Sequence, residues 1–230
     1  MENPWNAIEV PCDDYVHPMD RQAWPRRCLL PPQPYLGSFH EGKVMWLLGG
    51  FGTGTDMAID HVAHRATVLN WAQRNLGCES PSIPNLWIDA EGDDPSFKAT
   101  RDVRWWRKAT GALYTAMSPH LGESRAWSAL SVRLFVLEAF PYPARTRPNY
   151  RLPSHAYTAQ LLAKWIESGR PIVVGRAERF WCELVPGLRK ALDANQAVRV
   201  RNVQSATISV GNLFGGADDF SRVVKALLGE

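Results

Sequence analysis

The chain has 230 residues, 45% of them apolar, and a formal net charge of +3, which is the composition of an ordinary soluble globular protein. It has no apolar run long enough to cross a membrane and no basic-then-apolar start typical of a secretory signal, so we expect a cytoplasmic protein. Four scattered cysteines without a Cys-x-x-Cys pair argue against a zinc ribbon, an iron–sulfur site and a disulfide framework.

The N-terminal part of the chain differs from the rest in composition. Residues 1–42 are rich in proline and aromatic residues and show no sustained periodicity. Proline disfavours both helix interiors and central strands. We therefore expect an irregular N-terminal arm over residues 1–42, packed on a single α/β domain that spans residues 43–230.

The first strong signal is a strand, a glycine-rich turn and a helix in succession. The apolar run Lys43–Leu48 predicts a buried strand, and residues 49–54 then contain four glycines. Asp56 stands before apolar residues at helical spacing. Such a turn presents unpaired N–H groups and a positive helix end, which suit an anion, although the turn lacks both the nucleoside-triphosphate and the dinucleotide fingerprints. A tight connection without a ligand is the alternative.

The remaining elements follow from periodicity and from turn residues. In chain order, the pattern predicts a loop over 77–99, a helix over 100–117, a strand over 131–138, a helix after Ser154, a strand over 171–175, a helix through Phe180 and Trp181, a strand over 198–203, a polar turn over 204–212 and a helix over 217–228. Strands that alternate with helices indicate right-handed βαβ units. The sequence therefore predicts a three-layer α/β/α fold around a central, mostly parallel four-stranded sheet.

Three predicted strand ends carry the most informative side chains. In parallel sheets, ligands bind beyond the carboxyl ends of the strands. Those ends are the glycine turn with Asp56, the carboxylate of Glu138, and the turn from Asn202 to Asn212. We expect the three to converge on one cleft. The basic face of the 100–117 helix suits either phosphate binding or a solvated surface.

This order of parts resembles the uracil-DNA glycosylase superfamily over most of residues 43–228. Residues 47–52 look like the family's glycine-containing turn, which holds the water-activating residue. Residues 136–138 look like its base-reading strand end, and residues 204–209 look like its DNA-clamping turn. Phe51 stands where the family has its catalytic aspartate or asparagine, and the last turn lacks the family's histidine and prolines.

The resemblance implies a monofunctional DNA glycosylase and a role for each matching position. Asp56, at the exit of the turn, is our candidate for water activation, with Asp60 as the other nearby carboxylate. Glu138 is assigned to base recognition, and Phe51 or Tyr142 to base stacking. The other expected base contacts come from Gly50 and Gly52. Contacts to the DNA backbone are expected from Ser205, Thr207, Ser209, Asn212, Arg145 and Arg147.

The glutamate at position 138 indicates which base is read. An ionised carboxylate can only accept hydrogen bonds, and carboxylates accept from the N4 amino group of cytosine. The open glycine turn leaves room for a large substituent. Together with the glutamate and this turn, the resemblance implies a glycosylase that removes glucosylated hydroxymethylcytosine from phage DNA in anti-phage defence. We expect DNA as the partner, and no cofactor, no metal, no membrane contact and a monomer.

Two other kinds of function fit the same residues. A hydrolase or transferase acting on a nucleotide or nucleoside would use the same glycine turn and carboxylate. A DNA-binding module could keep the fold and lack the chemistry, since Phe51 replaces the family's acid. Structural roles are also open: Asp56 is suited to cap a helix, Tyr142 to pack in the core, and Glu138 to pair with a nearby arginine.

Overall fold

The computed structural model describes residues 2–10, 13–50, 62–77, 83–89, 95–144 and 150–230. Within these ranges the chain forms a mixed α/β fold around one five-stranded sheet. In spatial order the strands are β1 (Tyr35–Leu36), β3 (Leu134–Glu138), β2 (Val44–Leu48), β4 (Ile172–Val174) and β5 (Ala197–Arg199). All neighbouring strands are parallel except β1, which runs antiparallel to β3. The predicted mostly parallel sheet is confirmed, with one strand more than expected.

Strand β2 lies at the centre of the sheet. All of its residues are buried, and it pairs in parallel with β3 on one side, where Leu48 lies opposite Glu138. On its other side it pairs with β4, where Leu47 lies opposite Val174. A strand buried on both faces has a continuous apolar sequence, which is why the 43–48 run predicted it. The chain passes from β2 to β3 and then returns across β2 to β4, so the topological switch point lies between β2 and β4.

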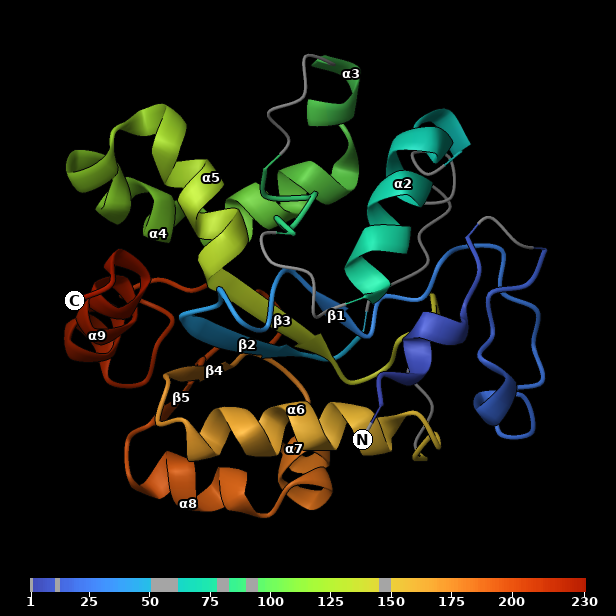
Figure 1. Cartoon of the computed structure of the whole chain (residues 1–230). Coiled ribbons are helices and arrows are strands. Elements are labelled where there is room, and N and C mark those ends of the chain that lie inside the picture. Colours follow the sequence, from blue (N-terminus) through green and yellow to red (C-terminus); the bar gives the residue numbers. More distant parts are fainter. Residues whose placement is uncertain (1, 11–12, 51–61, 78–82, 90–94, 145–149) are drawn as a thin grey trace.

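Helices cover both faces of this sheet (Figure 1). One face is covered by α2 (Arg65–Leu76), α3 (Pro95–Lys98), α4 (Arg101–Leu121), α5 (Glu123–Arg133) and α9 (Gly216–Leu228), and the other by α6 (His155–Glu167), α7 (Glu178–Leu184) and α8 (Gly187–Asp193). Alternation along β2 explains the two layers: Trp46 belongs to the apolar cluster of the first face, and Met45 and Leu47 belong to that of the second. The arrangement fits the expected three layers.

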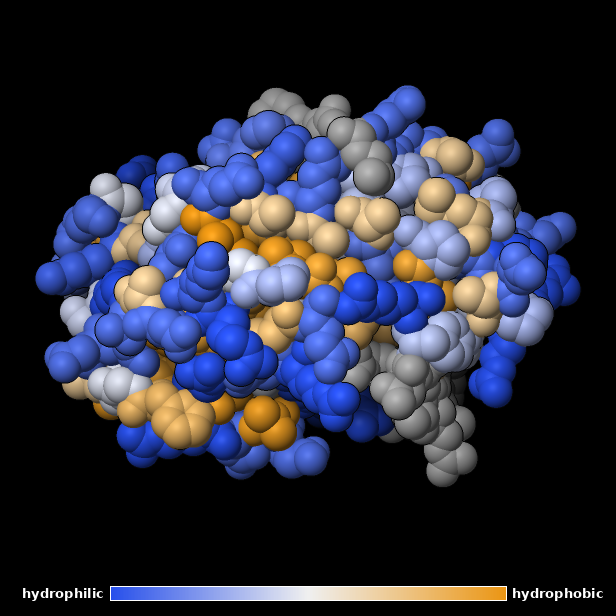
Figure 2. Space-filling view, turned by 90° about the horizontal axis from the view of Figure 1, so that it is seen from below, coloured by the Kyte–Doolittle hydropathy of each residue, from blue (hydrophilic) through white to orange (hydrophobic). Residues whose placement is uncertain are grey.

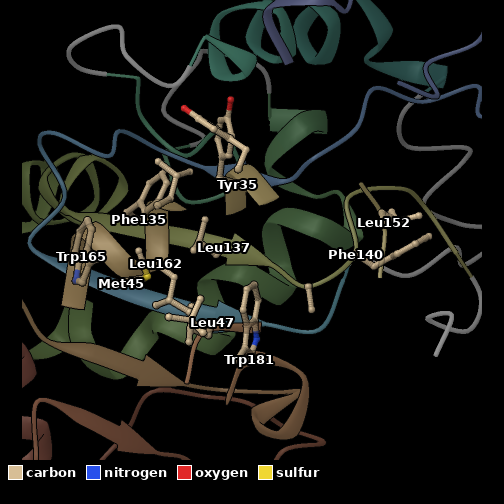
Figure 3. Packing of buried hydrophobic residues seen from close by; sticks show 14 of the residues in the cluster. Tyr35, Met45, Leu47, Phe135, Leu137, Phe140, Leu152, Leu162, Trp165 and Trp181 are labelled. Atoms are coloured by element: carbon tan, nitrogen blue, oxygen red, sulfur yellow. The ribbon is translucent and has the colours of Figure 1, made fainter. Parts of the chain in front are cut away.

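The core under α6 and α7 also fixes the end of β2. Figure 3 shows the side chains of Phe135, Trp165 and Trp181 over the sheet, and Trp165 belongs to α6 and Trp181 to α7. The Phe135 and Trp165 rings are stacked with their centroids 5.7 Å apart. Trp181 donates its indole N–H to the carbonyl of Leu48 at 3.1 Å. The last residue of β2 is therefore tied to α7, which holds the following glycines in place.

The N-terminal segment is more ordered than its composition predicted. It contributes strand β1, where Tyr35 lies opposite Leu137, and two short 3₁₀ helices, Pro4–Ala7 and Pro18–Asp20. Its Trp5 belongs to the same buried cluster as the residues of α6–α8. Two residues in an edge strand are too few to produce an alternating pattern, so β1 could not be predicted from the sequence.

Two predicted strand boundaries are wrong. Residues 131–133 form the last turn of α5, where Ser131 donates its hydroxyl to the carbonyl of Ser128, so β3 begins only at Leu134. The strand predicted over 198–203 is β5, which ends at Arg199. After it, the backbone of Arg201 donates to the carbonyl of Asn212, so the chain leaves the sheet and pairs with its own turn.

The outer surface of the α6–α8 layer mixes polar and apolar side chains. Figure 2, seen from below, shows hydrophilic residues interspersed with hydrophobic groups on this face. Across the described ranges, no helix combines the length and the apolar character needed to cross a bilayer.

Candidate functional site

Three segments meet at the carboxyl ends of the central strands. They are Gly49 and Gly50 after β2, Glu138 at the end of β3, and Arg176 shortly after β4. The Gly50 amide donates to Oε2 of Glu138 at 2.6 Å, and the Arg176 amide donates to the carbonyl of Leu47 at 3.1 Å. A Cβ built on Gly49 would lie 3.5 Å from the Arg176 Cβ. The three segments therefore enclose the switch point, where ligands bind in sheets of this kind.

Gly50 has a backbone conformation that only glycine adopts readily. Its φ is +126°, and a Cβ at this position would lie 3.2 Å from both the Cβ and the carbonyl oxygen of Phe140. This close approach carries the Gly50 amide to the carboxyl of Glu138. Glycine is thus required here to bring the end of β2 against the end of β3.

Glu138 is a buried acid with few partners. Its relative exposure is 3%, and its backbone amide donates to the carbonyl of Pro34 at 3.0 Å. In the described part of the chain, the amide of Gly50 supplies the only hydrogen bond to its side chain. Burial raises the pKa of Glu138 to about 8, and the Gly50 hydrogen bond and the charge of Arg176 oppose that rise. At neutral pH the carboxyl is therefore mainly protonated.

Arg176 is the site residue that sequence reasoning missed. Its Nε donates to the carbonyl of Val203 at 2.9 Å and its Nη2 to that of Gln204 at 2.8 Å. The guanidinium also lies 5.8 Å from the ring centroid of Trp105 on α4. Arg176 thus fastens the turn after β5 to the switch point. Arg176 directly follows the strand predicted over 171–175, which ends in a glycine, and this position could have indicated a site residue.

The side chains of the turn after β5 largely bond to one another. Asn212 accepts from the amide of Asn202 at 2.8 Å and donates to the carbonyl of Thr207 at 2.8 Å. The hydroxyl of Ser205 lies 3.4 Å from that of Thr207, and Ser209 is half-buried. Asn212 and Thr207 therefore shape the turn, which leaves Ser205 and Ser209 as the hydroxyls better placed for an outside ligand.

Tyr142 occupies a different environment from the one a base-stacking residue needs. Its side chain is fully buried, and its hydroxyl donates to Oδ2 of Asp20 at 2.7 Å and accepts from the amide of His17 at 3.0 Å. Burial, followed by the neighbouring charge of Asp20, raises the pKa of Tyr142. A ring enclosed in this way offers no face to a base.

Several expected site residues lie outside the described residues: Phe51, Gly52, Asp56, Asp60, Arg145 and Arg147. Of the remaining candidates, the structure brings Gly50 and Glu138 together, and Arg176 connects them to the turn that carries Ser205. No three histidine, cysteine, aspartate or glutamate side chains gather as metal ligands would within the described ranges.

Comparison with known proteins does not extend these observations. No family model, no curated protein and no solved structure matches the chain. The geometry at the switch point is therefore the basis for a functional assignment. It consists of a buried acid whose pKa is raised, a glycine amide fixed against it, and an arginine whose hydrogen bonds are directed to the neighbouring turn.

Proposed function

We propose that the protein is a DNA glycosylase that hydrolyses the N-glycosidic bond of a modified cytosine, such as glucosylated hydroxymethylcytosine in phage DNA, and leaves an abasic site as an anti-phage defence. One observation carries this proposal: the carboxyl of Glu138 is buried at the end of β3, beside the switch point, and among the described residues it accepts a single hydrogen bond, from Gly50. A carboxyl oxygen accepts from the cytosine N4 amino group. The resemblance of residues 43–228 to the uracil-DNA glycosylase superfamily supports the reaction class.

The chemistry requires two kinds of group around the extruded base. Cleavage of the bond builds positive charge on the sugar and negative charge on the base. A carboxylate that orients water serves the sugar, and Asp56 is our candidate. Glu138 and the Gly50 amide serve the base. Phe51 is now the preferred stacking residue, because Tyr142 is enclosed in the core.

DNA binding is supported by the position of helix α4 beside the turn after β5. The amide of Ile208 in this turn donates to the carbonyl of Ala109 on α4 at 3.0 Å. The same helix exposes Arg101, Arg104 and Lys108. Cationic side chains beside a site favour the phosphates of a polyanion. With Ser205, Ser209, Arg145 and Arg147 they would hold the DNA backbone while the base leaves the stack, which costs a few kcal/mol.

The proposal is tested by incubation with genomic DNA from phages that carry different cytosine modifications, and with unmodified DNA. Mass analysis of released bases and alkali cleavage of abasic sites measure the product. Glu138→Ala should lower the rate about 10²–10³-fold, and Asp56→Asn should abolish release but retain DNA binding. Glu183→Ala is the matched control, because Glu183 is an exposed glutamate in a surface ion pair with Arg179. Base release from no DNA, or an unaffected Glu138→Ala variant, would contradict the assignment.

A free nucleotide or nucleoside also fits a switch-point site, as in other doubly wound sheets. A hydrolase or transferase of that class would turn over free nucleosides, and its DNA affinity would be weak and would fall steeply with salt. A binding module without chemistry would retain modified DNA and release no base. The same assay, extended to free nucleosides, separates these alternatives.

A further inference from the structure

The carboxyl of Glu138 is buried without an ion-pair partner in the described part of the chain. Arg176 is the charged side chain that acts on it, but the guanidinium directs two of its N–H groups to the carbonyls of Val203 and Gln204. An ionised carboxylate in such a place is unfavourable, because burial removes its hydration and the charge of Arg176 offsets only part of that cost. The surroundings therefore favour the neutral acid.

The Gly50 amide decides which oxygen of that acid carries the proton. It donates to Oε2 at 2.6 Å, so Oε2 is the acceptor in this contact, and the neutral form that suits the contact carries its proton on Oε1. The side chain then presents a fixed donor next to a fixed acceptor. Backbone contacts on either side, from Glu138 N to Pro34 O and from Ala139 N to Leu48 O, prevent the strand end from shifting.

This pattern is the complement of one pyrimidine edge. Cytosine presents an amino donor at N4 beside a lone pair at N3, so it matches an acceptor at Oε2 and a donor at Oε1. In the same pose uracil or thymine would place a carbonyl against Oε2 and an N–H against the Oε1 proton. An ionised Glu138 would instead direct negative charge at the N3 lone pair.

We propose that Glu138 meets cytosine as a neutral acid, donating from Oε1 to N3 and accepting N4–H at Oε2, and that its proton goes to the base as it departs. The inference rests on the proposed function. In the step, the C1′–N1 bond breaks and its electron pair goes to the base, which takes the Glu138 proton. A water oxygen bonds to C1′ and passes its proton to the general base assigned to Asp56. Both carboxyls then exchange protons with solvent.

The pH profile of base release tests the neutral state. Because burial raises the pKa of Glu138 to about 8, the wild-type rate should fall about tenfold per pH unit above that value. Glu138→Gln keeps one donor and one acceptor but has no proton to transfer, so it should bind cytosine and release base at a reduced rate that shows no alkaline decline. Glu183→Gln, on the exposed surface of α7, should retain the wild-type profile. A wild-type rate that is flat or rises through this range would overturn the inference.

A second measurement does not depend on catalysis. Infrared difference spectra of the wild type against Glu138→Gln should contain the band of a protonated carboxyl at neutral pH, and the band should disappear as the pH passes about 8. Base release without this band would overturn the neutral state alone. A band that titrates as expected, with no base released from any DNA, would overturn the glycosylase and the cytosine assignment with it.

Discussion

Two buried carboxyls in this molecule have opposite surroundings. Asp20 is fully buried and accepts two hydrogen bonds, from the Tyr142 hydroxyl at 2.7 Å and from the Ser154 amide at 2.9 Å. Glu138 is almost as buried but accepts only from Gly50 among the described residues. Where donors fill a carboxyl's oxygens, the acid holds segments together. Glu138 lies at the carboxyl end of a strand, and its second oxygen has no hydrogen bond from the described residues, which is the arrangement that our proposal assigns to a ligand.

The two acids also join different parts of the chain. Asp20 links the N-terminal segment to the chain after β3 through Tyr142 and to the start of α6 through Ser154. Glu138 instead joins the ends of neighbouring parallel strands through Gly50. The first set of contacts fastens a peripheral segment to the core, and the second joins β2 to β3 beside the switch point of the sheet.

The largest expected effect concerns the pH dependence of stability. The pKa of Glu138 in the folded protein, about 8, exceeds its ordinary value of 4.5, so the folded state binds a proton that the unfolded state releases. The stabilisation is complete below the ordinary value and is lost as the pH rises to about 8, with a ceiling of about 5 kcal/mol. Denaturant unfolding of the wild type and Glu138→Gln over this range measures the difference between them. If the free energies of unfolding of the two proteins change with pH in parallel, Glu138 is ionised in the folded state.

The contrasting prediction removes the satisfied acid. Asp20→Ala leaves the Tyr142 hydroxyl and the Ser154 amide without their acceptor, so the free energy of unfolding should fall by about 2–4 kcal/mol. At denaturant concentrations below its unfolding midpoint, the Asp20→Ala variant should still release base. Asp218→Ala, at an exposed position of α9, should change stability by less than about 0.5 kcal/mol. A stable Asp20→Ala variant without base release would place Asp20 in the functional site.

The hydrogen-bond partners that distinguish Asp20 from Glu138 could largely not be predicted from the sequence. The core elements were predictable because their signals are local: β2 is one apolar run, and α4 is capped by Thr100, whose hydroxyl accepts from the amide of Val103. The Asp20 contacts join residues 122 and 134 positions apart, and no local pattern encodes such contacts. Tyr142, which follows a strand end, therefore resembled a site residue as much as a core residue.

Part of the site was predictable for a topological reason. The carboxyl ends of parallel strands meet, and this rule placed Gly50 beside Glu138. Arg176 was missed because its partners are backbone carbonyls of residues 203 and 204, which have no side-chain signature. The protonation state of Glu138 depends on burial, which the sequence does not show. The expected base contact used an ionised acceptor, whereas burial raises the pKa of Glu138 and favours the neutral acid.

A smaller effect is expected from Gly50→Ala, which tests how Glu138 is held. The φ of +126° and the contacts with Phe140 are unfavourable for alanine, so the free energy of unfolding should fall by about 1–3 kcal/mol. Base release should fall further than stability predicts, because the Gly50 amide moves away from Oε2. Gly111→Ala in α4 is the control: nothing lies within 4 Å of its Cβ, and it should gain about 0.5–1 kcal/mol. Equal changes in the free energy of unfolding for Gly50→Ala and Gly111→Ala would show that position 50 does not require glycine.

The smallest expected effect belongs to Tyr142→Phe. The change removes one hydroxyl and keeps the ring, so the free energy of unfolding should fall by about 1 kcal/mol while base release is unchanged. In the Asp20→Ala background the same change should have less effect, because the hydroxyl has already lost its acceptor. A double-mutant cycle from denaturant unfolding measures this coupling. Additive losses would mean that Tyr142 acts through His17 instead of Asp20, and the satisfied carboxyl would then depend mainly on the Ser154 amide.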